Sequence, residues 1–295
     1  MTFDPVQLET LATIVEEGSF DGAAQRLHVT PSAVSQRVRA LEAAAGQVLV
    51  RRTLPAAVTA AGEPLLRLAR QWRMLEAEAG AIIGDNDVLD LQVAVNADSL
   101  ATWFRAVLAD VARRRGTALR LAVEDEGHSR ELLRSGAVLA AVTAEAKPVQ
   151  GCSVEPLGAM RYRAAVAPGL LAEHRRGNSA DWASMPMVVF NEKDQLQDTV
   201  LAARGVARPR VVHRVPTTAD FLAAVRAGMG WGLVPAQQFA PELARGALVR
   251  MPGAAHLDVP LFWQRWRLQS TALETLTTDV RSAARSGLRP PGRAD

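Results

Sequence analysis

The sequence predicts an α/β protein that begins with an all-α domain, and three patterns lead to this fold class. From residue 88 onward, strand-like and helix-like segments alternate, which is typical of a parallel sheet. Before residue 46, apolar residues recur at helical spacing. Between these regions, apolar residues at 65–82 are separated by three and four positions in turn, which indicates one face of a single long helix.

The composition excludes several classes of protein. The chain has 295 residues, enough for two or more domains with their own cores. It has no run of about 18 apolar residues, and MTFDPVQLE lacks a basic, apolar leader, so we expect no membrane span and no signal peptide. Cys152 is the only cysteine and the five histidines are far apart. We therefore expect no disulfide, metal site or cofactor, and a cytoplasmic location.

Two short helices are predicted first. Residues 4–17 carry apolar side chains at helical spacing, and Gly18 is expected to end this helix. Ser19 can then cap a second helix that runs to about Leu27.

A third helix is predicted to begin after Thr30, with Pro31 at its first position, where no N–H is needed, and to end at Gly46. One face is apolar and carries Val34, Val38, Leu41 and Ala45. Another face carries Ser32, Ser35, Gln36 and Arg39. Gln and Arg suit base edges in the major groove of DNA, and Ser reaches phosphates or bases. This pattern predicts a helix-turn-helix; the alternative is a three-helix bundle with a polar outer face.

A hairpin, or wing, is predicted to follow. VLVRR and AVT are β-prone runs separated by Leu54-Pro55-Ala56, and the hairpin would place its arginines beside the DNA backbone. Between residues 26 and 52, only Glu42 opposes five arginines, which are Arg26, Arg37, Arg39, Arg51 and Arg52. Such a patch is expected for phosphate contact, and a solvated charged face is the alternative.

A long helix is predicted from about Ala60 to Ile83, with Thr59 as its cap. Its apolar seam consists of Leu65, Leu68, Trp72, Leu75, Ala79 and Ile82. We expect this seam to form a dimer contact, because paired DNA half-sites need two recognition helices. The alternative is a stripe that packs on the chain's own core. Residues 84–88 would form the joint to the next domain.

The rest of the chain is predicted as two alternating sets of strands and helices. In the first set, strands are expected at 89–96, 118–124 and 138–144, with helices at 99–114 and 127–135. In the second set, strands are expected at 187–190, 211–215 and 231–235, with helices near 195–204, 218–227 and 236–244. A strand at 258–266 would return the chain to the first set, ahead of a last helix at 270–286. The tail at 285–295 is predicted to be disordered.

These segments resemble the LysR-type transcriptional regulators. The stretch FDGAAQRLHVTPSAVSQRVRALE, followed by GQVLVRRTLPAAVTAAGEPLL, is similar to their N-terminal domain and most similar to the ArgP/LysG-like branch, which senses basic amino acids. The family usually has Phe or a similar residue before the wing arginine, where this chain has Val50. The resemblance maps the recognition helix onto Pro31, Ser32, Ser35, Gln36 and Arg39, and the wing onto Arg51 and Arg52. Together with the cap Thr30, these are the candidate DNA-binding residues.

Further along, LAVEDEGHSRELLRSG and VRAGMGWGLVPA resemble segments of the same family, so the resemblance covers essentially the whole chain. It implies two Rossmann-like lobes of periplasmic-binding-protein type, joined by two crossings near Met160–Tyr162 and Phe262–Gln264. The expected domains are a winged helix-turn-helix at 1–59, a linker and dimerisation helix with its joint at 60–87, and an effector-binding domain at 88–295. Lobe I would comprise about 88–161 and 263–290, and lobe II about 162–262.

A small-molecule site is predicted where strands of the two lobes end, because open α/β sheets bind ligands there. The candidate residues are Asp98, Ser99, Glu124, Asp125, Thr143, Asn191, Thr217 and Thr218. Asp98-Ser99 and Thr217-Thr218 begin helices, whose free N–H groups could hold the carboxylate of an amino acid. Asp98, Glu124 or Asp125 could pair with an ammonium or a basic side chain. For each acidic residue, the alternative is an ordinary cap or surface charge.

The sequence therefore predicts a regulator that binds double-stranded operator DNA as a homodimer, or a tetramer, and acts on RNA polymerase. The resemblance implies lysine or arginine as effector and a basic-amino-acid exporter gene among the targets. The alternative is an architectural protein of chromosomes or replication origins. An enzyme is not expected, because the sequence has no nucleophile elbow, metal cluster or credible nucleotide loop.

Overall fold

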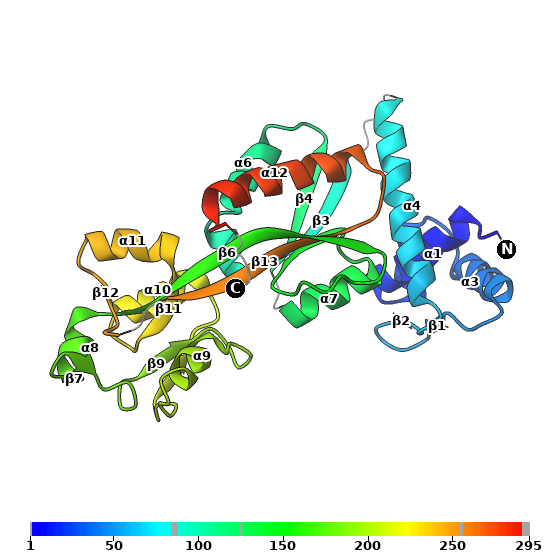
Figure 1. The fold of residues 1–295 in the computed structure, drawn as a ribbon. Helices are drawn as coiled ribbons and strands as arrows, with labels where there is room; N and C mark the ends of the chain where they lie inside the picture. The colour runs from blue at the N-terminus through cyan, green and yellow to red at the C-terminus, as the bar shows by residue number, and fades with distance from the viewer. Residues whose placement is uncertain (1, 84–87, 124–125, 254–255, 291–295) are drawn as a thin grey trace.

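The computed structural model describes residues 2–83, 88–123, 126–253 and 256–290 (Figure 1). A small helical domain at the N-terminus contacts one long helix, which in turn lies against an α/β domain of two lobes. This arrangement confirms the predicted fold class. Among the described residues, no helix has the length and apolar character to cross a membrane.

The N-terminal domain contains three helices, which are α1 (Pro5–Glu17), α2 (Phe20–Arg26) and α3 (Pro31–Ala45). Each begins with a side-chain cap: Asp4, Ser19 and Thr30 accept hydrogen bonds from backbone N–H groups of the first turns. Gly18 and Gly46 end α1 and α3, and both have a φ of 67°, which glycine adopts without steric cost. The predicted starts and ends of α1 and α3 are confirmed to within one residue.

The wing is a hairpin of β1 (Val50–Arg51) and β2 (Ala57–Val58), which pair antiparallel. The carboxylate of Glu42 on α3 accepts a hydrogen bond from the N–H of Leu49 at 2.9 Å. At the hairpin's tip, the N–H of Ala56 donates to the carbonyl of Gly18 at 2.7 Å. The wing is therefore attached to the helices at both its base and its tip.

The long helix α4 (Glu63–Ile82) begins three residues later than predicted. Thr59 does not cap it: its hydroxyl accepts from the N–H of Gly62 at 3.1 Å and donates to the carbonyl of Val48 at 2.7 Å. Thr59 thus closes a turn that leads away from the wing. A Cβ atom at Gly62 would lie 2.2 Å from the carbonyl oxygen of Leu49, so only glycine fits where the chain passes the wing and enters the helix.

Lobe I is built on β3 (Leu89–Val95), β4 (Thr117–Val123) and β5 (Ala140–Thr143), with β3 parallel to both neighbours. The helices α6 (Arg105–Ala112) and α12 (Thr271–Gly287) pack together on one side of the sheet, and α7 (Glu126–Ser135) packs on the other (Figure 1). The predicted helix at 99–114 is instead two helices, because a short α5 (Ala97–Ala101) ends at Thr102. There the chain turns to bury Trp103 and Phe104 in the core.

Two long strands run through both lobes. They are β6 (Cys152–Val166) and β13 (Leu257–Trp266), and they pair antiparallel from Tyr162–Leu257 to Cys152–Trp266. The register shifts between Leu261 and Phe262, next to the predicted crossing at Phe262–Gln264. The sequence predicts a crossing near Met160–Tyr162 but no strand, so β6 is an addition to the predicted elements.

Lobe II contains the strands and helices of the second alternating set and adds others that the sequence does not predict. Its strands are β7 (Arg175–Arg176), β8 (Ser179–Ala180), β9 (Met187–Val189), β10 (Val212–Arg214), β11 (Gly232–Pro235) and β12 (Val249–Arg250). Its helices are α8 (Pro168–Glu173), α9 (Leu196–Ala202), α10 (Thr218–Arg226) and α11 (Ala236–Ala244). The predicted elements are β9, β10, β11, α9, α10 and α11, and the additions are β7, β8, β12 and α8. Both β11 and β12 pair with β6, so the main sheet continues from one lobe into the other in the order β11-β6-β13-β5-β3-β4.

The predicted disorder of the C-terminal tail is wrong for its first residues. Residues 285–287 belong to α12, and Arg289 forms a β-bridge with Ala159, through hydrogen bonds of 2.9 and 3.0 Å. The bridge requires Gly158, where a Cβ atom would lie 2.4 Å from the carbonyl oxygen of Arg289. Residues 291–295 lie outside the described residues.

Candidate functional site

The third helix presents a polar face to solvent. Val34, Val38 and Leu41 are buried in the core of the N-terminal domain. On the other face, Thr30, Pro31, Ser32, Gln36 and Arg39 are exposed and Ser35 is half-buried. The predicted DNA-reading side chains are therefore accessible, and those expected to hold the helix in place are covered.

The basic patch contains fewer arginines without an acidic partner than the sequence indicates. Arg26 pairs with Glu17 at 2.9 Å and with Glu16 at 3.6 Å, so acidic residues of α1 offset its charge. Within the described residues, the remaining arginines of the patch pair with no carboxylate; they are Arg37, Arg39, Arg51 and Arg52. Both wing arginines are exposed, and the guanidinium carbon of Arg52 lies 4.5 Å from the centroid of the Phe20 ring.

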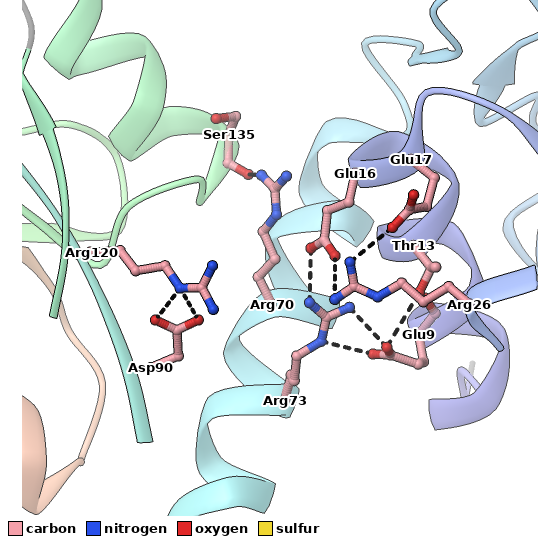
Figure 2. Close-up of polar contacts among 10 residues, drawn as sticks. All are labelled: Glu9, Thr13, Glu16, Glu17, Arg26, Arg70, Arg73, Asp90, Arg120 and Ser135. Carbon is pink, nitrogen blue, oxygen red and sulfur yellow. Dashed lines mark hydrogen bonds and ion pairs between the residues drawn. The ribbon is translucent and has the colours of Figure 1, made fainter. Parts of the chain in front are cut away.

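The long helix joins the two domains by polar contacts. Arg73 binds Glu9 and Glu16 of α1, with N···O distances of 2.8 Å to each (Figure 2). On the side of lobe I, Arg70 donates to the carbonyl of Ser135 at 2.9 Å (Figure 2). Glu78 accepts from the N–H of Thr271 at 2.6 Å, at the start of α12.

The predicted seam of α4 divides into two parts. Leu65 is only 8% exposed and packs in the core of the N-terminal domain, as the alternative interpretation expected. The exposed fractions of Leu68, Trp72, Leu75 and Ile82 are 38%, 47%, 39% and 81%, and Ala79 is also exposed. The described part of the chain leaves this later stripe uncovered.

Asp98 and Thr218 meet where the two lobes face each other. Asp98 lies at the start of α5 in lobe I, and the hydroxyl of Thr218, the first residue of α10 in lobe II, donates to its carboxylate at 3.4 Å. The hydroxyl of Tyr162, on β6, donates to the other carboxylate oxygen at 2.9 Å. Within the described residues, no arginine or lysine pairs with Asp98.

The surroundings of Asp98 disfavour its charge. Burial, the largest cause, raises the pKa of this carboxyl group to about 6, and the negative charge of Asp194 acts in the same direction. The hydrogen bonds from Tyr162 and Thr218 oppose the shift only in part. Asp194 itself accepts from the N–H groups of Phe190 at 2.8 Å and Leu196 at 3.1 Å. A cation between the lobes would relieve this unbalanced negative charge.

Other predicted effector residues have local structural partners. The Ser99 hydroxyl accepts from the indole N–H of Trp103, and the Ser99 N–H donates to Asn96. Thr217 caps α10 by accepting from the N–H of Asp220 at 3.2 Å.

Two further candidates also order loops. The hydroxyl of Thr143 donates to the carbonyl of Glu145 at 3.2 Å, and the amide oxygen of Asn191 accepts from the N–H of Lys193 at 2.9 Å. Glu124 and Asp125 lie outside the described residues. The structure therefore brings together Asp98 and Thr218 and adds Tyr162 and Asp194, which the sequence does not predict. Tyr162 is the only tyrosine of the chain, but its sequence position gave no sign of the partner.

The fold and these sites define a DNA-binding protein with a ligand-binding domain, and comparisons with known proteins identify its family. Residues 5–63 match the bacterial regulatory helix-turn-helix proteins of the lysR family, and residues 84–285 match the LysR substrate binding domain. The chain belongs to the LysR family of transcriptional regulators. Because its relatives are regulators, it is assigned to this class and not to an enzyme class.

Individual relatives match over nearly the whole chain. The lysine export transcriptional regulatory protein LysG of Corynebacterium efficiens is 48% identical, over 97% of this chain and 99% of its own. The structure of full-length LysG from Corynebacterium glutamicum with bound effector Arg has 46% identity and a TM-score of 0.84, covering 97% of this chain and 100% of that one. The structure of ArgP from Mycobacterium tuberculosis has 46% identity and a TM-score of 0.90, covering 99% and 100%. The predicted resemblance to the ArgP/LysG-like branch is thus confirmed.

Proposed function

We propose that this regulator binds a basic amino acid, arginine or lysine, between its lobes and changes its contact with operator DNA in response. The observation that carries the proposal is the carboxylate of Asp98, which accepts two hydroxyl hydrogen bonds and has no cationic partner among the described residues. A neutral ligand would leave this charge unbalanced, whereas a guanidinium or ammonium group would pair with it. The bound arginine of the related LysG structure supports the same class of ligand.

The contact between Asp98 and Thr218 joins the two lobes, so a ligand that binds Asp98 changes the interaction between them. Such a ligand shifts the protein between two arrangements only by its differential affinity for them. We propose that the ligand-bound arrangement alters how a homodimer, or a tetramer, sits on the operator and on RNA polymerase. The relationship to LysG supports a lysine- or arginine-export gene as a target.

Isothermal titration calorimetry of the full chain with arginine, lysine and histidine tests the ligand. We expect saturable binding of arginine or lysine, and a loss of at least tenfold in affinity for Asp98→Asn. Asp110→Asn is the matched control, because Asp110 pairs with Arg113 on the surface of α6. The proposal is wrong if none of the three amino acids binds, or if Asp98→Asn binds as the unmodified protein does.

Footprinting at low and raised salt tests the mode of DNA binding. A regulator protects selected sites, and this protection survives raised salt, because base contacts add to phosphate contacts. Uniform protection that disappears with salt would instead support the architectural role. The two experiments can fail independently, because calorimetry is done without DNA and footprinting is done without effector.

A further inference from the structure

Outside the Asp98 site, a pocket of about 370 Å³ lies at the junction of the lobes. Its walls come from β6, from the start of α11 in lobe II, and from the C-terminal end of α12 in lobe I. The side-chain amide of Gln237 on α11 donates to the carbonyl of Gly287, which joins the two lobes at the pocket. The volume is within the range of about 300–1,000 Å³ that is usual for small-molecule sites.

The register of the sheet explains why arginines gather there. Residues two apart on a strand share a face, and directly paired residues of antiparallel strands do too. Arg161 and Arg163 therefore lie on one face of β6, together with Arg250, which pairs with Ala165, and Arg289, which pairs with Ala159. Arg161, Arg163 and Arg289 line the pocket.

Among the described residues named here, positive charge exceeds negative charge on this face. Arg161 binds Asp258 through two hydrogen bonds, of 2.7 and 2.6 Å, and this contact holds the pKa of Asp258 below its usual value. Burial, followed by the charges of Arg250 and Arg161, lowers the pKa of Arg163, so these guanidinium groups repel one another. Four arginines and one aspartate leave a net charge of +3 on the named side chains.

This pocket is distinct from the site between the lobes. Tyr162, which binds Asp98, lies between Arg161 and Arg163 in sequence, so its side chain is on the opposite face of β6. Thr102 connects the two sites, because it lines the pocket while its hydroxyl donates to the carbonyl of Asp98 at 2.5 Å.

We propose that this pocket is a second small-molecule site and that it binds an anion with at least two negative charges, carried by phosphate or by carboxylate groups. Guanidinium groups bind both kinds of anion through paired hydrogen bonds. Because the pocket contacts both lobes, an anion bound there changes the affinity of the Asp98 site for its ligand, and the reverse coupling is equal. The binding site itself does not depend on which ligand Asp98 takes.

Calorimetry of the full chain at constant ionic strength, with pyrophosphate and with citrate as probes, tests this site. We expect saturable binding of at least one probe, and the stronger of the two identifies the source as a phosphate or a polycarboxylate compound. Arg163→Gln and Arg289→Gln are each expected to weaken that binding at least tenfold.

Arg285→Gln is the matched control, because Arg285 is exposed on α12 and lies four residues before Arg289 without lining the pocket. We expect it to change the affinity less than twofold, and circular dichroism melting shows that each variant is folded. The proposal is overturned if neither probe binds at 10 mM, about ten times the upper end of the roughly 1 μM to 1 mM range of metabolite sites. It is also overturned if the control weakens binding as much as the pocket variants do.

Discussion

At the scale of single residues, the side chains that we propose to bind DNA or effector are those that form no ion pair with another described residue. Gln36 and Arg39 are exposed on α3, whereas Arg26, which the sequence places in the same basic patch, pairs with Glu17. Similarly, Asp98 accepts hydrogen bonds but pairs with no described cation, whereas Asp220 interacts with Thr217. The available partners, more than residue type, distinguish a ligand-binding side chain from a structural one.

We expect Gln36→Ala and Arg51→Ala to weaken DNA binding in different ways. If Gln36 reads a base, its loss costs about 1–3 kcal/mol on the preferred sequence and relaxes the preference. Arg51→Ala should weaken binding to all sequences alike, because a phosphate contact carries no sequence information. It should also reduce the slope of log affinity against log salt concentration by the amount that one phosphate contact contributes. Competition with a randomised DNA library at several salt concentrations measures both effects. An unchanged preferred sequence in Gln36→Ala would exclude Gln36 as a base reader.

The affinity for arginine or lysine should fall as pH falls below about 6, because protonation of Asp98 competes with the cationic ligand. With a pKa of about 6, the loss between pH 7 and pH 5 is roughly tenfold. The raised pKa also means that the folded chain without ligand holds its proton more tightly than the unfolded chain does. The contribution of Asp98 to stability therefore declines as pH rises from about 4 to 6. Calorimetry from pH 5 to pH 8 measures the effect on affinity, and Asp98→Asn should abolish it; a flat profile in the unmodified protein would contradict this role.

At the scale of elements, α4 packs against two parts of its own chain and leaves a third side uncovered. Leu65, Leu66 and Ala69 pack in the N-terminal domain, while Met74 packs in the core of lobe I. The stripe from Leu68 to Ile82 remains exposed, which favours a second copy of the chain as its partner.

Leu75→Asp should therefore yield monomers, because it places a charge in the middle of the proposed contact while leaving the intrachain core untouched. Sedimentation velocity measures the change in mass. Glu76→Gln is the control, since Glu76 is an exposed neighbour on the same helix. A dimer that persists in Leu75→Asp at micromolar concentration would place the interface elsewhere.

At the scale of the whole molecule, local patterns predict the elements better than they predict the sites. The caps and glycines around α1 and α3 act within a few residues, so their boundaries follow from the sequence. By contrast, β6 pairs with β13, which lies about a hundred residues away in sequence. The residues that β6 contacts are therefore visible only in the fold. The same holds for Tyr162 and Asp98, whose contact joins positions 64 residues apart.

The contacts of α4 bear on how ligand binding in the α/β domain can affect the N-terminal domain. Arg70 and Glu78 fasten this helix to α7 and α12, both in lobe I, and Arg73 fastens it to α1. The N-terminal domain and lobe I are therefore both held by α4, and we infer that a bound ligand acts by moving lobe II relative to them, about β6 and β13. Ligand binding would then leave the shape of each protomer's N-terminal domain unchanged. It would act by changing which surfaces of a neighbouring protomer lobe II can contact.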